Sequence, residues 1–412
     1  MIDESLLDAP DALDRADLRG LLRSVAAAGA QVRTALRAVE ESPVPRLRPD
    51  GRPGTVLVAG PGPDAALTVD LLSALIDENV RVARLPATGA LAAPGALRWP
   101  LPNWAGALDL LLLTSTDGSE PGLGELLETA YRRGLTVVTV VPDRSSLADL
   151  TLRRRSLTIE LTHAPRVELP AHPAAPGPQW SLVTPLLYLC DRLGLCRAGE
   201  DALLAMADRL DATAERCGPA APVDANPAKA LAAEFAGSLP LLWSDGPLAA
   251  AAARHGAATL TGLSGLPALS AALPEAMTAH GALLGGSLTG GSEADDFFRD
   301  RVEEPPALHA RVVLLRSPAI LDPPGSSFGN GGGGAGAAER PAGPGPGPGP
   351  GPGPGPRFGA ADAARELAVE QGAALSELTP SDPSTPLEAA AELIAQLDFS
   401  AVYLALTSNN RT

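Results

Sequence analysis

The chain of 412 residues is long enough for two or three domains, each with its own hydrophobic core. Its formal net charge of −16 argues against binding to nucleic acid or to an anionic membrane surface, because both depend on clustered Lys and Arg. Apolar residues make up 45% of the chain but aromatic residues only 3%, so the cores must be rich in Ala, Leu and Val. This composition favours helices packed on parallel sheets, whose buried strands are aliphatic runs.

The first third of the chain predicts helices and then alternating strands and helices. Residues 1–50 carry Leu, Val and Ala at helical spacing and are expected to form N-terminal helices. Residues 51–162 are expected to form a first domain, in which Asp64 is the expected N-cap of the helix after the first strand. The strands expected in this domain are 55–59, 110–113, 135–141 and 156–161.

Alternating strands and helices predict βαβ units and a parallel sheet. Ligands of such sheets bind beyond the carboxyl ends of the strands, where the connections diverge. The loops that follow Ala59 and Leu113 are therefore the expected binding loops.

The second half of the chain predicts a connector and a second α/β domain. Residues 163–222 combine a segment rich in Pro and Ala with two amphipathic helices that would bridge the halves of the protein. Residues 223–412 are expected to form the second domain, interrupted at about 323–357 by a run rich in Gly-Pro pairs. Such pairs form neither helix nor central strand, so this segment is predicted to be a disordered insertion. The elements expected around it are helix 227–236, strand 239–243, strand 310–315, helix 360–371 and helix 387–406.

The remaining composition predicts a cytoplasmic protein without a cofactor. The three cysteines lack a C-x-x-C spacing and are expected to be buried thiols in a reducing compartment. The start of the chain is acidic and lacks the basic and apolar parts of a signal peptide, and no apolar run reaches membrane-spanning length. Four histidines show no metal-ligand spacing and are interpreted as incidental: His163, His172 and His255 in loops, and His309 beside the start of a strand.

Several segments together resemble the bifunctional phosphoglucose/phosphomannose isomerase family of SIS (sugar isomerase) proteins. The clearest are residues 226–234, which begin Asn-Pro-Ala-Lys, and residues 398–406, Asp-Phe-Ser-Ala-Val-Tyr-Leu-Ala-Leu. Residues 114–120 look like the second Ser/Thr phosphate loop of the family, and residues 177–187 lie where the family has its mid-chain helix. The resemblance implies an α/β fold of two SIS subdomains, each a parallel sheet flanked by helices. It also implies a phosphorylated sugar as ligand, and it leaves a homodimer open.

The candidate phosphate loop supplies hydroxyl groups and a close approach to the backbone. A phosphate site needs hydroxyls, inward-facing N–H groups and small residues, and the following helix adds its dipole. An ordinary turn-rich loop is the alternative, and Asp117 and Glu120 count against an anion. The candidate residues are Thr114, Ser115, Thr116, Gly118 and Ser119.

Lys229 is the only lysine of the chain and a second candidate contact of the sugar phosphate. A salt bridge with Glu234 or Asp224 is the alternative, since this is the commoner role of a lysine in the first turn of a helix.

Aldose–ketose isomerisation needs a carboxylate base, and a further acid/base group for ring opening. The resemblance places the ring-opening histidine at His280, for which a helix-end histidine without a catalytic task is the alternative. It places the base within residues 262–267, which contain no carboxylate, and a catalytic arginine near Gln179. Glu275, five residues before His280, is expected to be a solvated surface carboxylate.

These features leave three functions open. The first is an isomerase homologue that binds a hexose 6-phosphate and interconverts glucose or mannose 6-phosphate with fructose 6-phosphate, with an incomplete catalytic set. The second is a non-catalytic phosphosugar-binding sensor, which the absent base and arginine favour. The third is a structural partner in a hetero-oligomer, which the Gly-Pro insertion favours.

Overall fold

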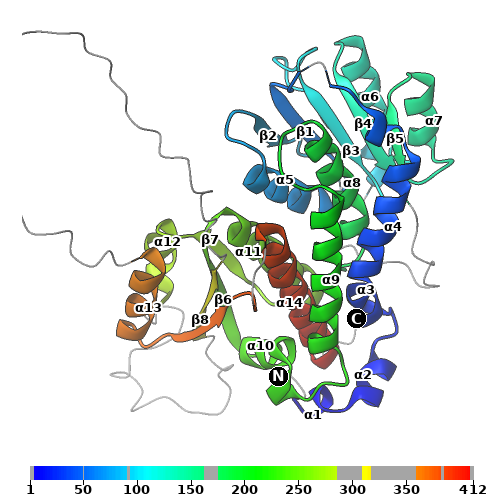
Figure 1. Ribbon diagram of the computed structural model, residues 1–412. Helices are drawn as coiled ribbons and strands as arrows, with labels where there is room; N and C mark the ends of the chain where they lie inside the picture. Colours follow the sequence, from blue (N-terminus) through cyan, green and yellow to red (C-terminus); the bar gives the residue numbers. More distant parts are fainter. Residues whose placement is uncertain are drawn as a thin grey trace, which may run out of the picture.

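The computed structural model describes residues 4–49, 51–90, 93–161, 175–284, 309–316, 359–381 and 385–408. The predicted insertion at 323–357 lies outside this part of the chain, as do His163 and His172. The described residues form two parallel sheets flanked by helices, and long helices lie between the sheets (Figure 1). This arrangement confirms the predicted fold class.

The first sheet has the strand order β2-β1-β3-β4-β5, and all its strands are parallel. Its strands are β1 (Thr55–Ala59), β2 (Arg81–Arg84), β3 (Leu110–Thr114), β4 (Thr136–Val141) and β5 (Leu157–Glu160). Alternate residues of the central strands face opposite layers. Val56 and Val58 pack against α5 (Asp64–Leu75), whereas Leu57 and Ala59 pack in the layer of α6 (Pro121–Arg132) and α7 (Ser146–Arg153). Both faces are therefore covered, as the aliphatic strands predict.

The second sheet has the order β7-β6-β8-β9 and is also parallel. Its strands are β6 (Ser238–Asp245), β7 (Leu269–Ala272), β8 (His309–Arg316) and β9 (Ala374–Leu378). One face packs in the large shared core with α10 (Pro227–Phe235), α11 (Pro247–Thr259) and α14 (Pro386–Thr407). The other face packs on α12 (Glu275–Leu284) and α13 (Ala360–Glu370).

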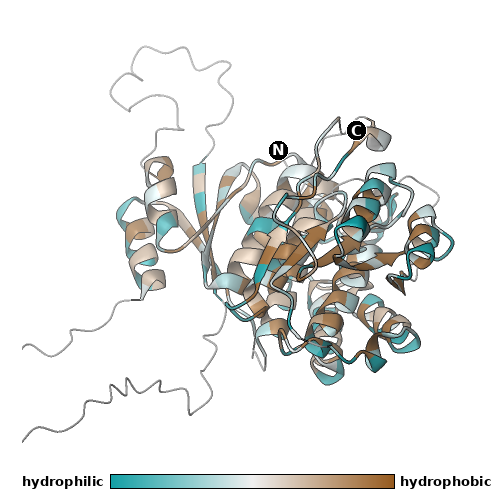
Figure 2. Cartoon of the chain, turned by 90° about the horizontal axis from the view of Figure 1, so that it is seen from above, coloured by the Kyte–Doolittle hydropathy of each residue, from teal (hydrophilic) through white to brown (hydrophobic). Residues whose placement is uncertain are grey.

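The two sheets are joined by helices that share one continuous core. Helices α4 (Ala28–Glu41), α8 (Gln179–Arg192), α9 (Glu200–Cys217) and α14 contribute to it, after the short helices α1 (Glu4–Leu7), α2 (Pro10–Ala16) and α3 (Leu21–Ala26). Helices α9 and α14 run side by side between the sheets (Figure 1). Hydrophobic residues are concentrated on the inner strands and hydrophilic residues on the outer helix faces (Figure 2). The core therefore extends across both halves of the chain.

Helix α14 is long and apolar enough to cross a membrane, but 89% of its apolar stretch is buried inside the fold. It is the central core helix, and its buried positions include the polar residues Glu392, Gln396 and Asp398. Two local predictions are corrected. Pro63 occupies the N-cap of α5 and Asp64 is its first residue, and α8 is buried on most of its surface rather than amphipathic.

Candidate functional site

The two predicted binding loops lie together at one point of the first sheet. The chain moves from β1 outward to β2 on one side, and from β3 to β4 and β5 on the other, so the connections diverge between β1 and β3. A side chain at Gly60, just after β1, would collide with the hydroxyl and carbonyl oxygens of Thr114 at the end of β3. The crevice where an α/β sheet binds its ligand is therefore bounded by these two loops.

The loop after β3 is held by its own side chains. Ser115 is 1% exposed; its Oγ accepts hydrogen bonds from the N–H groups of Asp117 (3.1 Å) and Gly118 (2.7 Å), and donates to the Glu120 carboxylate at 2.8 Å. The Ser119 hydroxyl donates to Asp117. Thr114 and Gly118 are also buried, so Thr116 and Ser119 are the predicted hydroxyl groups that reach the surface.

A cavity of about 640 Å³ opens beside this loop at the carboxyl ends of β3, β4 and β5. Thr116 and Ser119 line it together with Arg144, Ser145 and Ser146 of the loop after β4, which the sequence analysis did not identify. The sequence does contain a signal for this loop, because residues 142–146 form a second polar segment directly after an aliphatic strand. Asp117, Asp143 and Glu160 line the same cavity, and Asp143 pairs with Arg144 at 3.4 Å. The cavity therefore offers four hydroxyls and one guanidinium to an anion, against three carboxylates.

The loops after β3 and β4 are locked together through Gly118. Its φ is 68°, its carbonyl accepts hydrogen bonds from Leu147 N (3.0 Å) and Ser146 Oγ (2.9 Å), and a Cβ there would lie 2.5 Å from Ser145 Oγ. Arg144 in the second loop also has a left-handed φ, of 60°. Left-handed backbone costs a non-glycine residue about 1–2 kcal/mol.

We expect Gly118→Ala to lower the free energy of unfolding by at least about 1–2 kcal/mol, because it adds left-handed strain and a collision with Ser145. Urea unfolding measures the loss. Gly281→Ala is the control, because nothing lies near a Cβ at that helical position, and it should not destabilise the protein. Equal stability of Gly118→Ala and wild type would show that the two loops are not locked.

Lys229 is fully buried, and its ammonium group lies in the protein interior. Its Nζ donates to the carbonyl oxygens of Pro219 (2.8 Å) and Ala221 (2.7 Å) and lies 5.6 Å from the centre of the Tyr403 ring. The alternative salt bridge with Glu234 or Asp224 is not seen among the described residues, where Nζ bonds to carbonyl oxygens and Glu234 pairs with Arg311 at 3.2 Å. Burial lowers the pKa of Lys229. These contacts fix the loop before α10 and speak against a contact with a sugar phosphate.

His280 lies on α12, in the outer layer of the second domain. It is 7% exposed, and its Nδ1 accepts a hydrogen bond from Trp243 Nε1 at 2.9 Å. Burial lowers the pKa of the ring. The predicted base segment, 262–267, overlaps the π-helical turn Leu260–Ser264 and contains no carboxylate. Glu275 is exposed at the start of α12, as predicted. The part of the chain that the structure describes therefore brings no carboxylate from these segments to His280.

His255 is not an incidental loop residue as predicted. It lies within α11 with 5% of its side chain exposed, and its Nε2 is 2.7 Å from Asp398 Oδ1 on α14. Asp398 Oδ2 accepts a hydrogen bond from Gln179 Nε2 at 2.8 Å. The sequence does not reveal this pair, because Asp398 lies 143 residues after His255. The alanine-rich residues around His255 give no sign of a polar partner.

Neither metal nor thiol chemistry is evident among the described residues. No group of three or more His, Cys, Asp or Glu side chains there could hold a metal ion. The cysteines are free: Cys190 and Cys217 are buried, and burial raises the pKa of Cys196 to about 12.

Comparisons with known proteins agree with this architecture. Residues 224–322 match the bacterial phospho-glucose isomerase C-terminal SIS domain family. A structure from Silicibacter pomeroyi, assigned as a phosphosugar isomerase, is 17% identical at a TM-score of 0.52, over 92% of this chain and 95% of that one. A hypothetical protein from Thermus thermophilus gives 14% identity and a TM-score of 0.56, over 98% and 94%.

Tagatose-6-phosphate ketose/aldose isomerase from Escherichia coli is 14% identical to this chain, with a TM-score of 0.51, over 97% of this chain and 94% of that one. No curated protein sequence matches the chain. The predicted resemblance is confirmed: residues 224–322 match the C-terminal SIS domain of bacterial phospho-glucose isomerase, and the chain has the two-sheet α/β fold of structures assigned as phosphosugar isomerases.

Proposed function

We propose that this protein binds a hexose 6-phosphate in the cytoplasm and interconverts its aldose and ketose forms. The supporting observation is the cavity of about 640 Å³ at the carboxyl ends of β3, β4 and β5, whose rim carries four hydroxyls and Arg144. The phosphoryl group would bind Thr116, Ser119 and Arg144 near the first turns of α6 and α7, where hydroxyl and N–H donors meet the positive ends of the helix dipoles. The family resemblance supplies the expected reaction, between glucose or mannose 6-phosphate and fructose 6-phosphate.

Binding is tested by thermal unfolding with glucose 6-phosphate, fructose 6-phosphate and free glucose. Each sugar phosphate at about a hundred times its dissociation constant should stabilise the protein by about 2.7 kcal/mol, and free glucose should not. The double variant Thr116→Ala/Ser119→Ala should bind the phosphates more weakly, since both hydroxyls line the cavity. Asp117→Asn should bind them more tightly, because it removes a negative charge from the rim. Equal stabilisation by free glucose, or none by either phosphate, would contradict the proposal.

A non-catalytic phosphosugar sensor is the second candidate, and the placement of His280 favours it. His280 accepts a hydrogen bond from Trp243 in the outer layer of the second domain. The turn 260–264 contains no carboxylate that could act as the base. A coupled assay for the conversion of fructose 6-phosphate separates the two functions. Binding without turnover would identify the sensor. Absence of both binding and turnover would favour the third function, a structural partner in a hetero-oligomer.

A further inference from the structure

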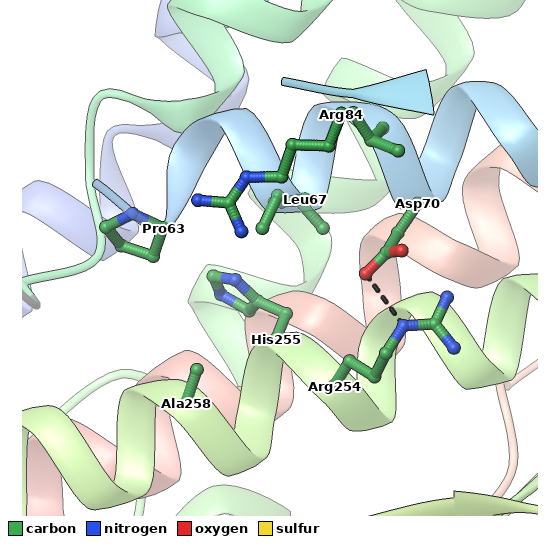
Figure 3. Close-up of a pocket in the computed structure, with 9 residues that line it drawn as sticks. Pro63, Leu67, Asp70, Arg84, Arg254, His255 and Ala258 are labelled. Carbon is green, nitrogen blue, oxygen red and sulfur yellow. Dashed lines mark hydrogen bonds and ion pairs between the residues drawn. The ribbon is translucent and has the colours of Figure 1, made fainter. Parts of the chain in front are cut away.

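A second cavity lies where the two domains meet, and its polar groups belong to neither predicted site. It has a volume of about 280 Å³ and is bounded by α5, the end of β2 and α11. Figure 3 shows Leu67 and Ala258 on its walls, with Arg84 extending over it from β2 and the ring of His255 facing it from α11. Arg254 and Asp70 form an ion pair at its side, at 2.8 Å. The cavity is mostly apolar, with a few polar groups directed into it, as in small-molecule sites.

His255 is held at this cavity as an oriented base. Its Nε2–H donates to Asp398, so the neutral ring carries its lone pair on Nδ1. Thr259 Oγ1 lies 3.4 Å from the same Nε2. Among the described residues no hydrogen bond reaches Nδ1, and the side chain is 5% exposed. A base whose far nitrogen is fixed by a carboxylate is the arrangement that activates proton transfer in enzymes. Gln179 holds the carboxylate in turn, and its own Oε1 accepts from Gly177 N at 2.5 Å.

Two observations connect this cavity with the proposed sugar site. The resemblance places a catalytic arginine near Gln179, and Gln179 contacts the partner of His255. Pro63 on the cavity wall belongs to the loop after β1, and Gly60 of the same loop lies against Thr114 at the end of β3. The loop after β1 therefore borders both this cavity and the loop that carries Thr116.

The charges around His255 suit a group that both accepts and donates a proton. The charged residues that face it are Asp64 and Asp70 on α5, Arg84 on β2, Arg254 on α11 and Asp398 on α14. Burial lowers the pKa of His255, but the carboxylates, Asp398 above all, outweigh burial and raise it above 6.5. Burial also raises the pKa of Asp64 to about 6. A raised pKa makes the neutral ring a stronger base.

We propose that the cavity between α5, β2 and α11 receives the carbonyl end of the sugar phosphate, and that His255, oriented by Asp398, moves the proton between C2 and C1. This inference rests on the proposed function and gives it a base, which residues 262–267 lack. Nδ1 takes the proton from C2 of the open-chain aldose; the C2–H electron pair forms the C1=C2 bond, and the carbonyl electrons move to O1. The ring returns the proton to C1, the C2 hydroxyl proton passes to O1, and C2 becomes the ketone carbon. Arg84 faces the negative charge that develops on oxygen.

Exchange of the C2 proton of glucose 6-phosphate in deuterated water, followed by NMR, tests the inference. Wild type should exchange this proton, and His255→Gln should be slower by about a hundred- to ten-thousand-fold. His309→Gln is the matched control, because His309 is exposed at the start of β8, and it should exchange at the wild-type rate. In wild type the rate should rise with pH through a transition above pH 6.5, because only the neutral ring accepts a proton.

Binding is measured on the same samples by thermal shift, so that a failure of the proposed function is recognised separately. Absence of binding by wild type would remove the proposed function and this inference together. Binding without exchange in wild type, or exchange that persists in His255→Gln, would overturn the inference alone. If His255→Gln does not fold, the histidine NMR signals of wild type replace it. A shift of the His255 signal on addition of glucose 6-phosphate supports the inference, and an unchanged signal contradicts it.

Discussion

Replacing Glu392 should destabilise the protein more than almost any other single change. Its side chain is 1% exposed on the central helix α14 and is paired with Arg216 at 2.6 Å and Arg209 at 3.3 Å. The same carboxylate accepts hydrogen bonds from Ser381 N and Oγ, at 3.1 and 2.9 Å. Removal of one partner from a buried ion pair leaves the other charge uncompensated and costs about 3–5 kcal/mol. We therefore expect Glu392→Ala to lower the free energy of unfolding in urea by about that amount.

The pH dependence of the stability difference between wild type and a Glu392 variant tests whether the charge of Glu392 causes it. Burial raises the pKa of Glu392, but the hydrogen bonds from Arg216 and Ser381 outweigh burial and hold the pKa below 4.5. A carboxylate with a lowered folded-state pKa stabilises the fold above its unfolded pKa, and this stability is lost as the pH falls through the folded pKa. The difference between wild type and Glu392→Gln should therefore be constant near pH 7 and shrink below pH 4.5. Glu366→Gln, at an exposed position on α13, is the control and should change stability by less than about 0.5 kcal/mol. An equal loss in both variants would contradict the buried ion pairs.

The buried strands of the fold could be predicted from the sequence, whereas several edge strands could not. Strand β1 coincides with the predicted 55–59, and β3 and β4 lie within one residue of the predicted ends, because both of their faces are covered and an unbroken aliphatic run results. The strands that the sequence did not predict, β2, β7 and β9, all lie at sheet edges and contain exposed residues such as Arg81 and Glu377. Their sequences therefore lack the aliphatic signal.

The candidate site was predicted in part for a similar reason. Polar loops after buried strands are visible in a sequence, so the loop after β3 was found, and Thr116 and Ser119 line the cavity beside it. Which hydroxyls turn inward is decided by hydrogen bonds such as that from Ser115 to Glu120, which spacing does not reveal. The pair formed by His255 and Asp398 joins α11 to α14, and contacts between distant segments leave no local pattern.

The two clearest segments of the family resemblance turn out to contact each other. Asn226 caps α10 by accepting hydrogen bonds from Ala228 N and Lys229 N, at 3.0 Å each, and Lys229 lies over the ring of Tyr403 on α14. The Tyr403 hydroxyl donates to Cys217 O at 2.7 Å. These residues join α9, α10 and α14 around one polar cluster. The motif 226–229 therefore anchors the second domain to the central helix.

Replacing Lys229 tests whether this lysine is structural or binds substrate. We expect Lys229→Met, which keeps a long side chain but removes both donors, to lower the free energy of unfolding by about 2–4 kcal/mol. The carbonyls of Pro219 and Ala221 would lose a partner, at about 1–3 kcal/mol each, and removal of a buried charge offsets part of this. Lys229→Ala should cost more, because it also leaves a cavity. In both variants glucose 6-phosphate should still raise the unfolding temperature by as much as in wild type. A Lys229→Met protein of full stability that no longer responds to glucose 6-phosphate would instead make Lys229 a contact of the phosphate.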